Sequence, residues 1–291
     1  MSLTTFLKTK DVKERFCQQF NMPKLTVEKA LLAPPLSNRY SLVGTAFDYL
    51  MRFYLKWLNP DAATSKWVAE LSITHPLSPL LKDVVVKYET REIISYTETE
   101  LTRKAHWILE QAKTDYSTYL SSGQISQQLL ESALRLAQLD PIFRARFVDE
   151  NLGTVYKEDI DDLRQLMSIV ESGLFKAIHL CLLNPTFGEA SRLVGGADAD
   201  LLIDDKIIDI KTTKNLQLKR DYFDQLIGYF VLHEIASIGG LEPKPKISTV
   251  GIYFSRHAYL YTLELQDIID AETFPGFVSW FIDRAKQEHA V

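Results

Sequence analysis

Apolar residues recur at three- and four-residue intervals through most of the first two thirds of the chain, the spacing of amphipathic helices. One or two short helices are expected before Pro34-Pro35. An apolar helix is expected over residues 44–58, ending before the helix-stopping pair Asn59-Pro60. From about residue 61 to residue 183 the pattern predicts almost wholly helical structure, with long helices over 98–120, 124–139 and 161–183.

The pattern changes after Gly195-Gly196. The next segment, ADADLLIDDKIIDIKTTK, is rich in Ile and Leu with a polar break at Asp204-Asp205, which predicts a β-hairpin. A helix is expected over 221–238, a second strand pair follows it, and a last helix is expected over 272–290. A helical body followed by the order β-β-α-β-β-α predicts an α/β or α+β core with a helical insertion.

The register of the hairpin determines which side chains meet. If Asp204-Asp205 forms a two-residue turn, Asp200 faces Asp209, and Asp198 faces Lys211. Directly opposed residues point to the same face of a sheet, so these four share one face. The other face then holds a core set: Leu201, Ile203, Ile208 and Ile210. A three-residue turn that includes Lys206 would give a different register.

Two opposed carboxylates repel each other, and a divalent cation removes that cost because hard ions such as Mg²⁺ take carboxylate oxygens as ligands. The alternative is a solvated hairpin face with alternating charges. Because Asp209 and Lys211 are expected on the polar face, truncating either is expected to leave no cavity in the core. Removal of Asp209 is even expected to relieve repulsion in the metal-free protein.

Three polar-tipped side chains form one stripe on the helix after the hairpin. Tyr222, Gln225 and Tyr229 lie at positions i, i+3 and i+7. Such a stripe can contact a phosphate backbone or orient Lys211. The alternative is a helix that packs on the sheet with two tyrosines at its rim.

Composition changes this picture little. The net charge of −5 is mild evidence against a protein that coats nucleic acid, although clustered carboxylates also make a nuclease acidic. The two cysteines, Cys17 and Cys181, are expected to be buried thiols in a reducing compartment. The first residues carry too many charges for a signal peptide, and no apolar run is long enough to span a membrane. We therefore expect a cytoplasmic protein.

The hairpin and the helix together resemble a known family. Asp200 followed by Asp209-Ile210-Lys211 resembles the D…(D/E)XK signature of the PD-(D/E)XK nuclease superfamily. Gln225-Leu-Ile-Gly-Tyr229 resembles the Q-x-x-x-Y motif of its RecB-like branch. That branch also has an early helix with Gly-x-x-x-His, and here Gly44-Thr-Ala-Phe-Asp48 has the spacing with Asp instead of His.

The resemblance implies a restriction-endonuclease-like core, a mixed sheet flanked by helices, with a large helical insertion. The corresponding organisation is an N-terminal helical segment (1–43), a first core helix (44–58) that packs against the hairpin, a helical insertion (59–190) and the core sheet and helices (191–291).

The resemblance also implies a metal site and the roles of its residues. Asp200, Asp209 and the backbone carbonyl of Ile210 would hold Mg²⁺ or Mn²⁺. Lys211 would position a water or stabilise charge on the phosphate, and Gln225 with Tyr229 would hold the substrate or Lys211. Three further residues are candidate ligands: Asp48, which could instead form an i,i+4 pair with Arg52; Asp198, a partner of Lys211 or a ligand if the strand shifts by two residues; and Glu189, a weaker candidate.

The expected activity is metal-dependent hydrolysis of phosphodiester bonds in nucleic acid, with DNA as the expected substrate and possible protein partners in repair or phage defence. Five basic residues could meet the nucleic-acid backbone: Lys206, Lys211, Lys214, Lys219 and Arg220. The alternative function is a catalytically inactive nuclease-fold module that binds nucleic acid or a protein partner. A further alternative is an unrelated helical scaffold with a charged hairpin.

Overall fold

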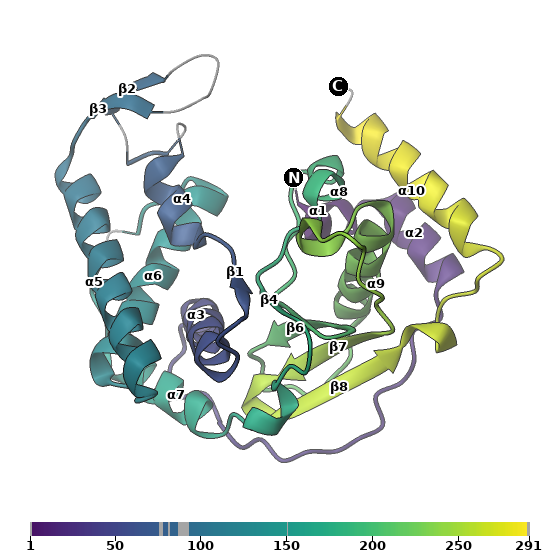
Figure 1. Cartoon of the computed structure of the whole chain (residues 1–291), viewed down its shortest axis with the longest axis horizontal. Helices are drawn as coiled ribbons and strands as arrows, with labels where there is room; N and C mark the ends of the chain where they lie inside the picture. Colours follow the sequence, from purple (N-terminus) through teal and green to yellow (C-terminus); the bar gives the residue numbers. More distant parts are fainter. Residues whose placement is uncertain (1, 76–77, 81, 87–92, 150, 290–291) are drawn as a thin grey trace. The chain divides into compact units, whose positions relative to one another are not determined.

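The structure is a computed structural model that describes residues 2–75, 78–80, 82–86, 93–149 and 151–289. It is a mixed α/β protein (Figure 1) whose chain divides into two compact units. The sheet unit comprises Met1–Leu32, Asp61–Thr64 and Glu171–Val291, and the helical unit comprises Ala33–Pro60 and Ser65–Val170. No helix among the described residues is long and apolar enough to cross a membrane.

The sheet unit contains a six-stranded mixed sheet of order β1-β4-β5-β6-β7-β8. Its strands are β1 (Ala63–Thr64), β4 (Cys181–Leu183), β5 (Leu201–Ile203), β6 (Lys206–Lys211), β7 (Thr249–Phe254) and β8 (Tyr259–Glu264). β1 is parallel to β4 and β6 is parallel to β7, while the other neighbours are antiparallel. The expected hairpin over the Asp204-Asp205 turn and the expected second strand pair are both present.

Five helices of this unit share one core with the sheet (Figure 1). They are α1 (Leu3–Phe6), α2 (Lys10–Gln19), α8 (Gly188–Leu193), α9 (Arg220–Ile235) and α10 (Phe274–His289). α9 connects β6 to β7, because parallel neighbours need a crossover and a helix is the usual one. Ile207 and Val250 point toward this helical layer and are fully buried. The alternating residues Ile208 and Tyr253 are buried on the opposite face, where the Phe175 ring packs edge-on against Tyr253.

Among its described residues, the helical unit contains five helices and a two-stranded sheet. The helices are α3 (Tyr40–Leu58), α4 (Val68–Thr74), α5 (Glu100–Ser122), α6 (Gln127–Ala145) and α7 (Lys157–Ser168), and β2 (Lys82–Val86) pairs with β3 (Ile93–Thr97). α3 ends before Asn59-Pro60 as expected and packs on α5, α6 and α7. α5 begins after Thr99, whose hydroxyl caps the helix, and ends at Gly123 in the left-handed conformation.

The expectation of almost wholly helical structure over 61–183 was wrong in part. β1, β2, β3 and β4 all fall within it, and α7 ends at Ser168 instead of continuing to residue 183. β2 and β3 are rich in β-branched residues, which favour strands. β4 has only three residues and is a strand because β1 and β5 flank it, a tertiary cause that a local helical pattern does not reveal. The expectation for the cysteines also holds only in part, since Cys181 is buried but Cys17 is exposed.

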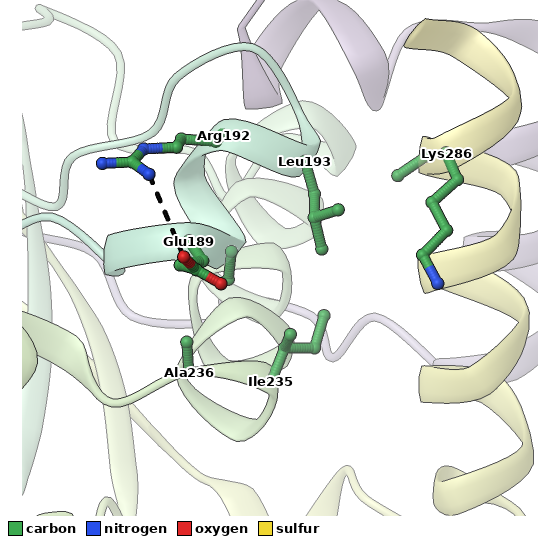
Figure 2. Close-up of a pocket in the computed structure, with 8 residues that line it drawn as sticks. Glu189, Arg192, Leu193, Ile235, Ala236 and Lys286 are labelled. Atoms are coloured by element: carbon green, nitrogen blue, oxygen red, sulfur yellow. Dashed lines mark ion pairs between the residues drawn. The ribbon is translucent and has the colours of Figure 1, made fainter. Parts of the chain in front are cut away.

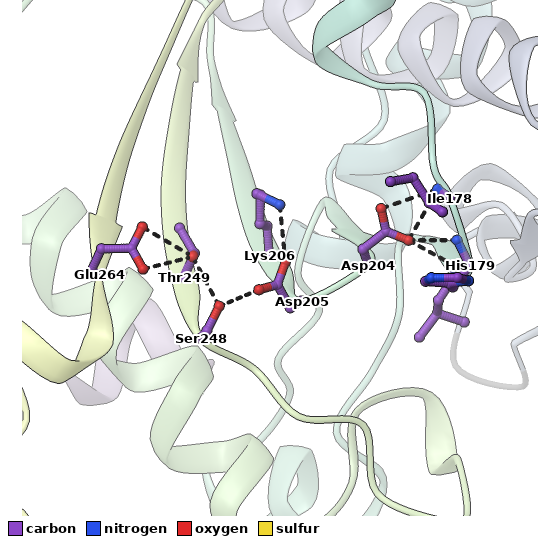
Figure 3. Close-up of polar contacts among 9 residues, drawn as sticks. Ile178, His179, Asp204, Asp205, Lys206, Ser248, Thr249 and Glu264 are labelled. Carbon is purple, nitrogen blue, oxygen red and sulfur yellow. Dashed lines mark hydrogen bonds and ion pairs between the residues drawn. The ribbon is translucent and has the colours of Figure 1, made fainter.

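The turn of the β5–β6 hairpin is held by the carboxylate of Asp204 (Figure 3). It accepts hydrogen bonds from the backbone N–H groups of Ile178 (3.1 Å), His179 (2.7 Å) and Leu180 (3.1 Å). Burial acts to raise the pKa of Asp204, but these three donors outweigh it and hold the pKa below its usual value. Asp204 has φ 52°, a left-handed conformation that Asp, Asn and Gly tolerate best.

We expect Asp204→Gly to lower the free energy of unfolding by about 1–3 kcal/mol, because three backbone donors lose their acceptor while the glycine keeps the backbone conformation. Because the folded pKa of Asp204 is depressed, its contribution is present above the unfolded pKa and is lost as the pH falls through the folded value. Urea unfolding of wild type and variant, over the pH range between the folded and unfolded pKa values of Asp204, measures both the loss of stability and its pH dependence. A wild-type-minus-variant difference that does not shrink in acid would contradict the role of the charge.

Candidate active site

The register of the hairpin is the one expected from a two-residue turn. Ile203 pairs with Lys206 and Leu201 pairs with Ile208, so a shift by two residues is excluded. The pair Leu201–Ile208 is the one farthest from the turn, and Asp200 and Asp209 are the next residues beyond it on the two strands. Ile208 is buried as expected, but Ile210 is only half-buried. The carboxylate-bearing face also carries buried Ile207 and is therefore not a solvated polar face.

Asp200 bridges neighbouring strands through both its backbone and its side chain. Its carboxylate Oδ2 accepts a hydrogen bond from the backbone N–H of Ile210 at 2.6 Å. Its backbone carbonyl accepts one from the N–H of Asn184, just after β4, at 2.8 Å. Asp200 therefore leaves the hairpin ladder, and its carboxylate is fixed to the strand that carries Asp209 and Lys211.

The backbone of Asp198 pairs on the β4 side of the hairpin. Asp198 forms an antiparallel bridge with Thr186, and its Oδ2 accepts a hydrogen bond from the Nδ2 of Asn184 at 2.8 Å. Asn184, in a left-handed conformation with φ 53°, thus contacts both Asp198 and Asp200. Asn184 was not among the site residues expected from the sequence. The only local signal was an asparagine next to Pro185 at the end of an apolar run.

Lys211 connects the strand to the helix. Its Nζ lies 2.7 Å from Oδ2 of Asp209, donates a hydrogen bond to Oε1 of Gln225 at 3.0 Å and lies 5.0 Å from the centre of the Tyr222 ring. The Asp209 side chain is only 3% exposed. The free-energy cost of burying the Lys211 ammonium is therefore offset by the ion pair with Asp209, the hydrogen bond to Gln225 and the cation–π contact with Tyr222.

Gln225 extends this network along α9. Its Nε2 donates a hydrogen bond to the hydroxyl of Tyr229 at 2.6 Å, and the Tyr229 ring stacks on Phe187 at 5.6 Å. The expected stripe at positions i, i+3 and i+7 therefore faces the strand that carries Lys211. Phe187, which fixes one face of the Tyr229 ring, was not anticipated.

The electrostatics of two neighbouring groups report a concentration of negative charge. Burial acts to lower the pKa of Lys211, but the charges of Asp209 and Asp200 outweigh it and raise that pKa. The pKa of the buried Tyr229 hydroxyl lies well above its usual value because of burial first, and then because of Asp209, Asp200 and Asp198. All three carboxylates thus act on one small region, which favours a bound cation.

The donor set fits a magnesium-type ion better than a transition metal. Among the described residues, no group of three or more His, Cys, Asp or Glu side chains gathers as a metal site. Mg²⁺, however, keeps several waters and commonly takes only one or two carboxylates from the protein. Asp200, Asp209 and the carbonyl of Ile210 would supply such a set. An ion there would compete with Lys211 for the carboxylate of Asp209.

Asp48 lies on α3 in the helical unit. Its Oδ2 forms an i,i+4 ion pair with Arg52 at 2.6 Å, and the Arg52 guanidinium lies over the Tyr49 ring. This is the structural pairing that the sequence offered as the alternative to metal binding. The other oxygen, Oδ1, is buried and accepts no hydrogen bond from the described residues. Its role as a metal ligand stays a prediction, as does packing of α3 on the hairpin.

The basic residues after the turn have different surroundings. Lys214 and Lys219 are exposed, and Lys219 lies 5.4 Å from the Tyr222 ring centre. Lys206 pairs with its neighbour Asp205 at 2.9 Å. Arg220 pairs with buried Asp224 at 2.8 Å and donates to the carbonyl of Phe20, so it is part of the fold.

Glu189 lies on α8 and lines a separate cavity of about 660 Å³ (Figure 2). Leu193 and Ile235 give this cavity apolar walls, and Lys286 lies across it from Glu189. Glu189 is strongly exposed and pairs with Arg192 at 3.9 Å. None of the expected metal-binding residues Asp200, Asp209 and Ile210 lines this cavity.

Comparison of the chain with models of protein families, with curated proteins and with solved structures gives no match in any of the three.

Proposed function

We propose that the protein is a metal-dependent nuclease that hydrolyses phosphodiester bonds in DNA. The observation that carries this proposal is the continuous network of Asp209, Lys211, Gln225 and Tyr229, with Asp200 fixed beside it. It joins the two carboxylates and the lysine of the D…DxK pattern to the glutamine and tyrosine of the helix pattern. A solvated charged hairpin would not need a buried aspartate or a helix-bound lysine.

The residues of this network would have distinct tasks. Asp200, Asp209 and the Ile210 carbonyl would hold Mg²⁺ or Mn²⁺, which supplies an acidified water and polarises the phosphate. Lys211, kept protonated by the surrounding carboxylates, would stabilise negative charge that develops on the phosphate. Gln225 holds the Lys211 ammonium by its oxygen and the Tyr229 hydroxyl by its nitrogen, so it would fix the direction of the lysine.

The topology of the sheet unit supports the same proposal. β5 and β6 form the hairpin, α9 crosses over to the parallel strand β7, and helices cover the face that bears the carboxylates. This order agrees with the restriction-endonuclease-like core implied by the sequence resemblance. The part of the helical unit that follows α3, residues 65–170, would then belong to the expected insertion.

A cleavage assay tests the proposal. Purified protein is incubated with linear duplex, circular duplex and single-stranded DNA, with Mg²⁺ or Mn²⁺ or with EDTA. We expect cleavage of at least one substrate with either ion and none with EDTA. Binding of DNA without cleavage under any of these conditions would support the inactive nuclease-fold module instead. Neither binding nor cleavage would leave the charged-scaffold alternative.

A further inference from the structure

A small cavity lies beside the Lys211 network, between the N-terminal segment and the first turns of α9. It measures about 140 Å³. Its lining consists of Thr4, Leu7 and Lys8 from the N-terminal segment and Asp221, Tyr222, Asp224 and Gln225 from α9.

Two of the lining residues contact the proposed catalytic lysine. Gln225 accepts a hydrogen bond from Nζ of Lys211, and the Tyr222 ring lies under the same ammonium. A group that entered the cavity would therefore be held next to the point where Lys211 acts. The N-terminal segment reaches this point because Gly228 of α9 has no side chain. A Cβ there would lie 3.2 Å from Leu3 and 3.3 Å from Leu7.

The volume suits one aromatic ring. An engineered apolar cavity of roughly 150 Å³ binds benzene, so a space of this size takes one pyrimidine-sized ring and excludes a base pair. A base can reach such a space only from a single strand or after it leaves the duplex stack, at a cost of a few kcal/mol that a single strand avoids.

The chemistry of the lining suits a nucleotide. Tyr222 offers a ring for stacking, and aromatic stacking is the main way in which single strands are bound. Lys219, exposed and 5.4 Å from the same ring centre, is in position to meet an adjacent phosphate. The lining carries charges of both signs, since Lys8 adds an ammonium to the carboxylates of Asp221 and Asp224, and Oδ1 of Asp224 pairs with Arg220 at 2.8 Å. The side chain of Asp221 is 54% exposed, and its carboxylate would accept a hydrogen bond from the exocyclic amino group of cytosine but repel the O4 acceptor of thymine.

We propose that this cavity binds one unpaired base of a single-stranded nucleic acid, cytosine in preference to thymine, next to the bond to be cleaved. The inference rests on the proposed nuclease function for the identity of the neighbouring site. It narrows the substrate of that site from nucleic acid in general to a strand with an accessible unpaired base.

The test is a binding measurement that does not depend on cleavage. Fluorescence anisotropy in EDTA, at one fixed salt concentration, compares short labelled oligonucleotides: single-stranded DNA, the same sequence as a duplex, the RNA equivalent, oligo(dC) and oligo(dT). Thr4→Trp fills the cavity from its exposed rim. Thr5→Trp is the matched control, since Thr5 is equally exposed on the same helix and does not line the cavity.

We expect single-stranded DNA to bind more tightly than the duplex and oligo(dC) more tightly than oligo(dT). Thr4→Trp should weaken single-strand binding at least about 5-fold, while Thr5→Trp should leave it unchanged. Tyr222→Leu should weaken it about 5- to 150-fold, the range for the loss of one stacked base, and Tyr222→Phe should retain most of it. If Thr4→Trp does not fold, the Tyr222 pair decides alone. The RNA arm identifies which kind of strand is preferred.

Equal binding by wild type and Thr4→Trp, or by Tyr222→Leu and Tyr222→Phe, would overturn the base site, and so would equal binding of single strand and duplex. Equal binding of oligo(dC) and oligo(dT) would overturn the role of the carboxylates. The two proposals fail separately. Duplex cleavage that Thr4→Trp does not affect would support the nuclease and overturn the base site. Single-strand binding that Thr4→Trp weakens, without cleavage under any metal, would support the base site and overturn the nuclease.

Discussion

Asp209→Asn is expected to reduce metal-dependent cleavage by at least about 100-fold, the loss seen when one preorganised charge-stabilising group is removed from an active site. Asparagine keeps the size of the side chain but removes the charge that would bind the ion and that pairs with Lys211 at 2.7 Å. Initial cleavage rates with saturating Mg²⁺ measure the effect. Activity within a few-fold of wild type would remove Asp209 from the proposed mechanism.

Lys211→Met should give a loss of similar size, and the same strand offers a matched control. Lys206 lies at the other end of β6. Among the described residues, its ammonium pairs only with the neighbouring Asp205, whose side chain is 44% exposed. Surface pairs of this kind contribute roughly 0–1 kcal/mol, so Lys206→Met should retain both stability and cleavage. Equal losses in the two variants would mean that positive charge along β6 serves general DNA binding, not the chemical step.

The burial of Asp209 changes the expected stability of its variants. The sequence indicated an exposed hairpin face, on which truncation would cost little and would relieve repulsion. Instead, Asp209 is 2% exposed and holds the ammonium of Lys211. Asp209→Asn should therefore destabilise the metal-free protein by about 1–3 kcal/mol, because the lysine loses its closest counter-charge. Added Mg²⁺ should raise the melting temperature of wild type but not of the variant. Equal increases in melting temperature in the two proteins would mean that the ion binds elsewhere.

The hairpin was predictable because its information is local. Alternation of apolar and charged residues on either side of Asp204-Asp205 determines the register. Asp209 and Lys211 lie two residues apart on β6 and therefore share one face. The i, i+3, i+7 stripe on α9 was predictable for the same reason. Its direction toward Lys211 follows from the crossover between parallel strands.

The surroundings of the two upstream aspartates were not predictable, because they depend on a strand that the helical pattern concealed. β4 adds a partner on the far side of β5, and Asn184 then binds the Asp198 side chain and the Asp200 backbone. Pairing rules for an isolated hairpin place Asp198 opposite Lys211, whereas in the structure the backbone of Asp198 forms a bridge with Thr186. The burial of Asp209 was not predictable either, because α9 covers the face of the sheet that carries this residue. The pattern of the two hairpin strands alone does not show that a helix lies there.

Another buried carboxylate, which the sequence did not mark as a site residue, lies in the helical unit. Asp140 of α6 is 6% exposed, and its Oδ1 accepts a hydrogen bond from the hydroxyl of Tyr49 on α3 at 2.6 Å. Burial raises the pKa of Asp140 to about 6, with Asp48 adding to the rise. The Tyr49 hydrogen bond and the charges of Arg52 and Arg144 oppose it only in part.

The sign of the consequence follows from linkage. The folded pKa is raised, so the stability that Asp140 contributes is fully present below its unfolded pKa of about 4 and is lost as the pH rises through about 6. The size of the loss is roughly 3 kcal/mol, since each pKa unit corresponds to about 1.4 kcal/mol. Above this window the folded protein carries a buried charge that its neighbours do not fully compensate.

Asp140→Asn should remove this pH dependence while keeping an oxygen that accepts the Tyr49 hydrogen bond. We expect the variant to gain stability relative to wild type by roughly 3 kcal/mol as the pH rises from about 4 to about 7. Urea unfolding followed by tryptophan fluorescence measures this difference, because three of the four tryptophans, Trp57, Trp67 and Trp107, lie in the helical unit. A wild-type-minus-variant difference that is constant across the range would mean that Asp140 is ionised throughout and that Arg52 and Arg144 fully compensate its burial.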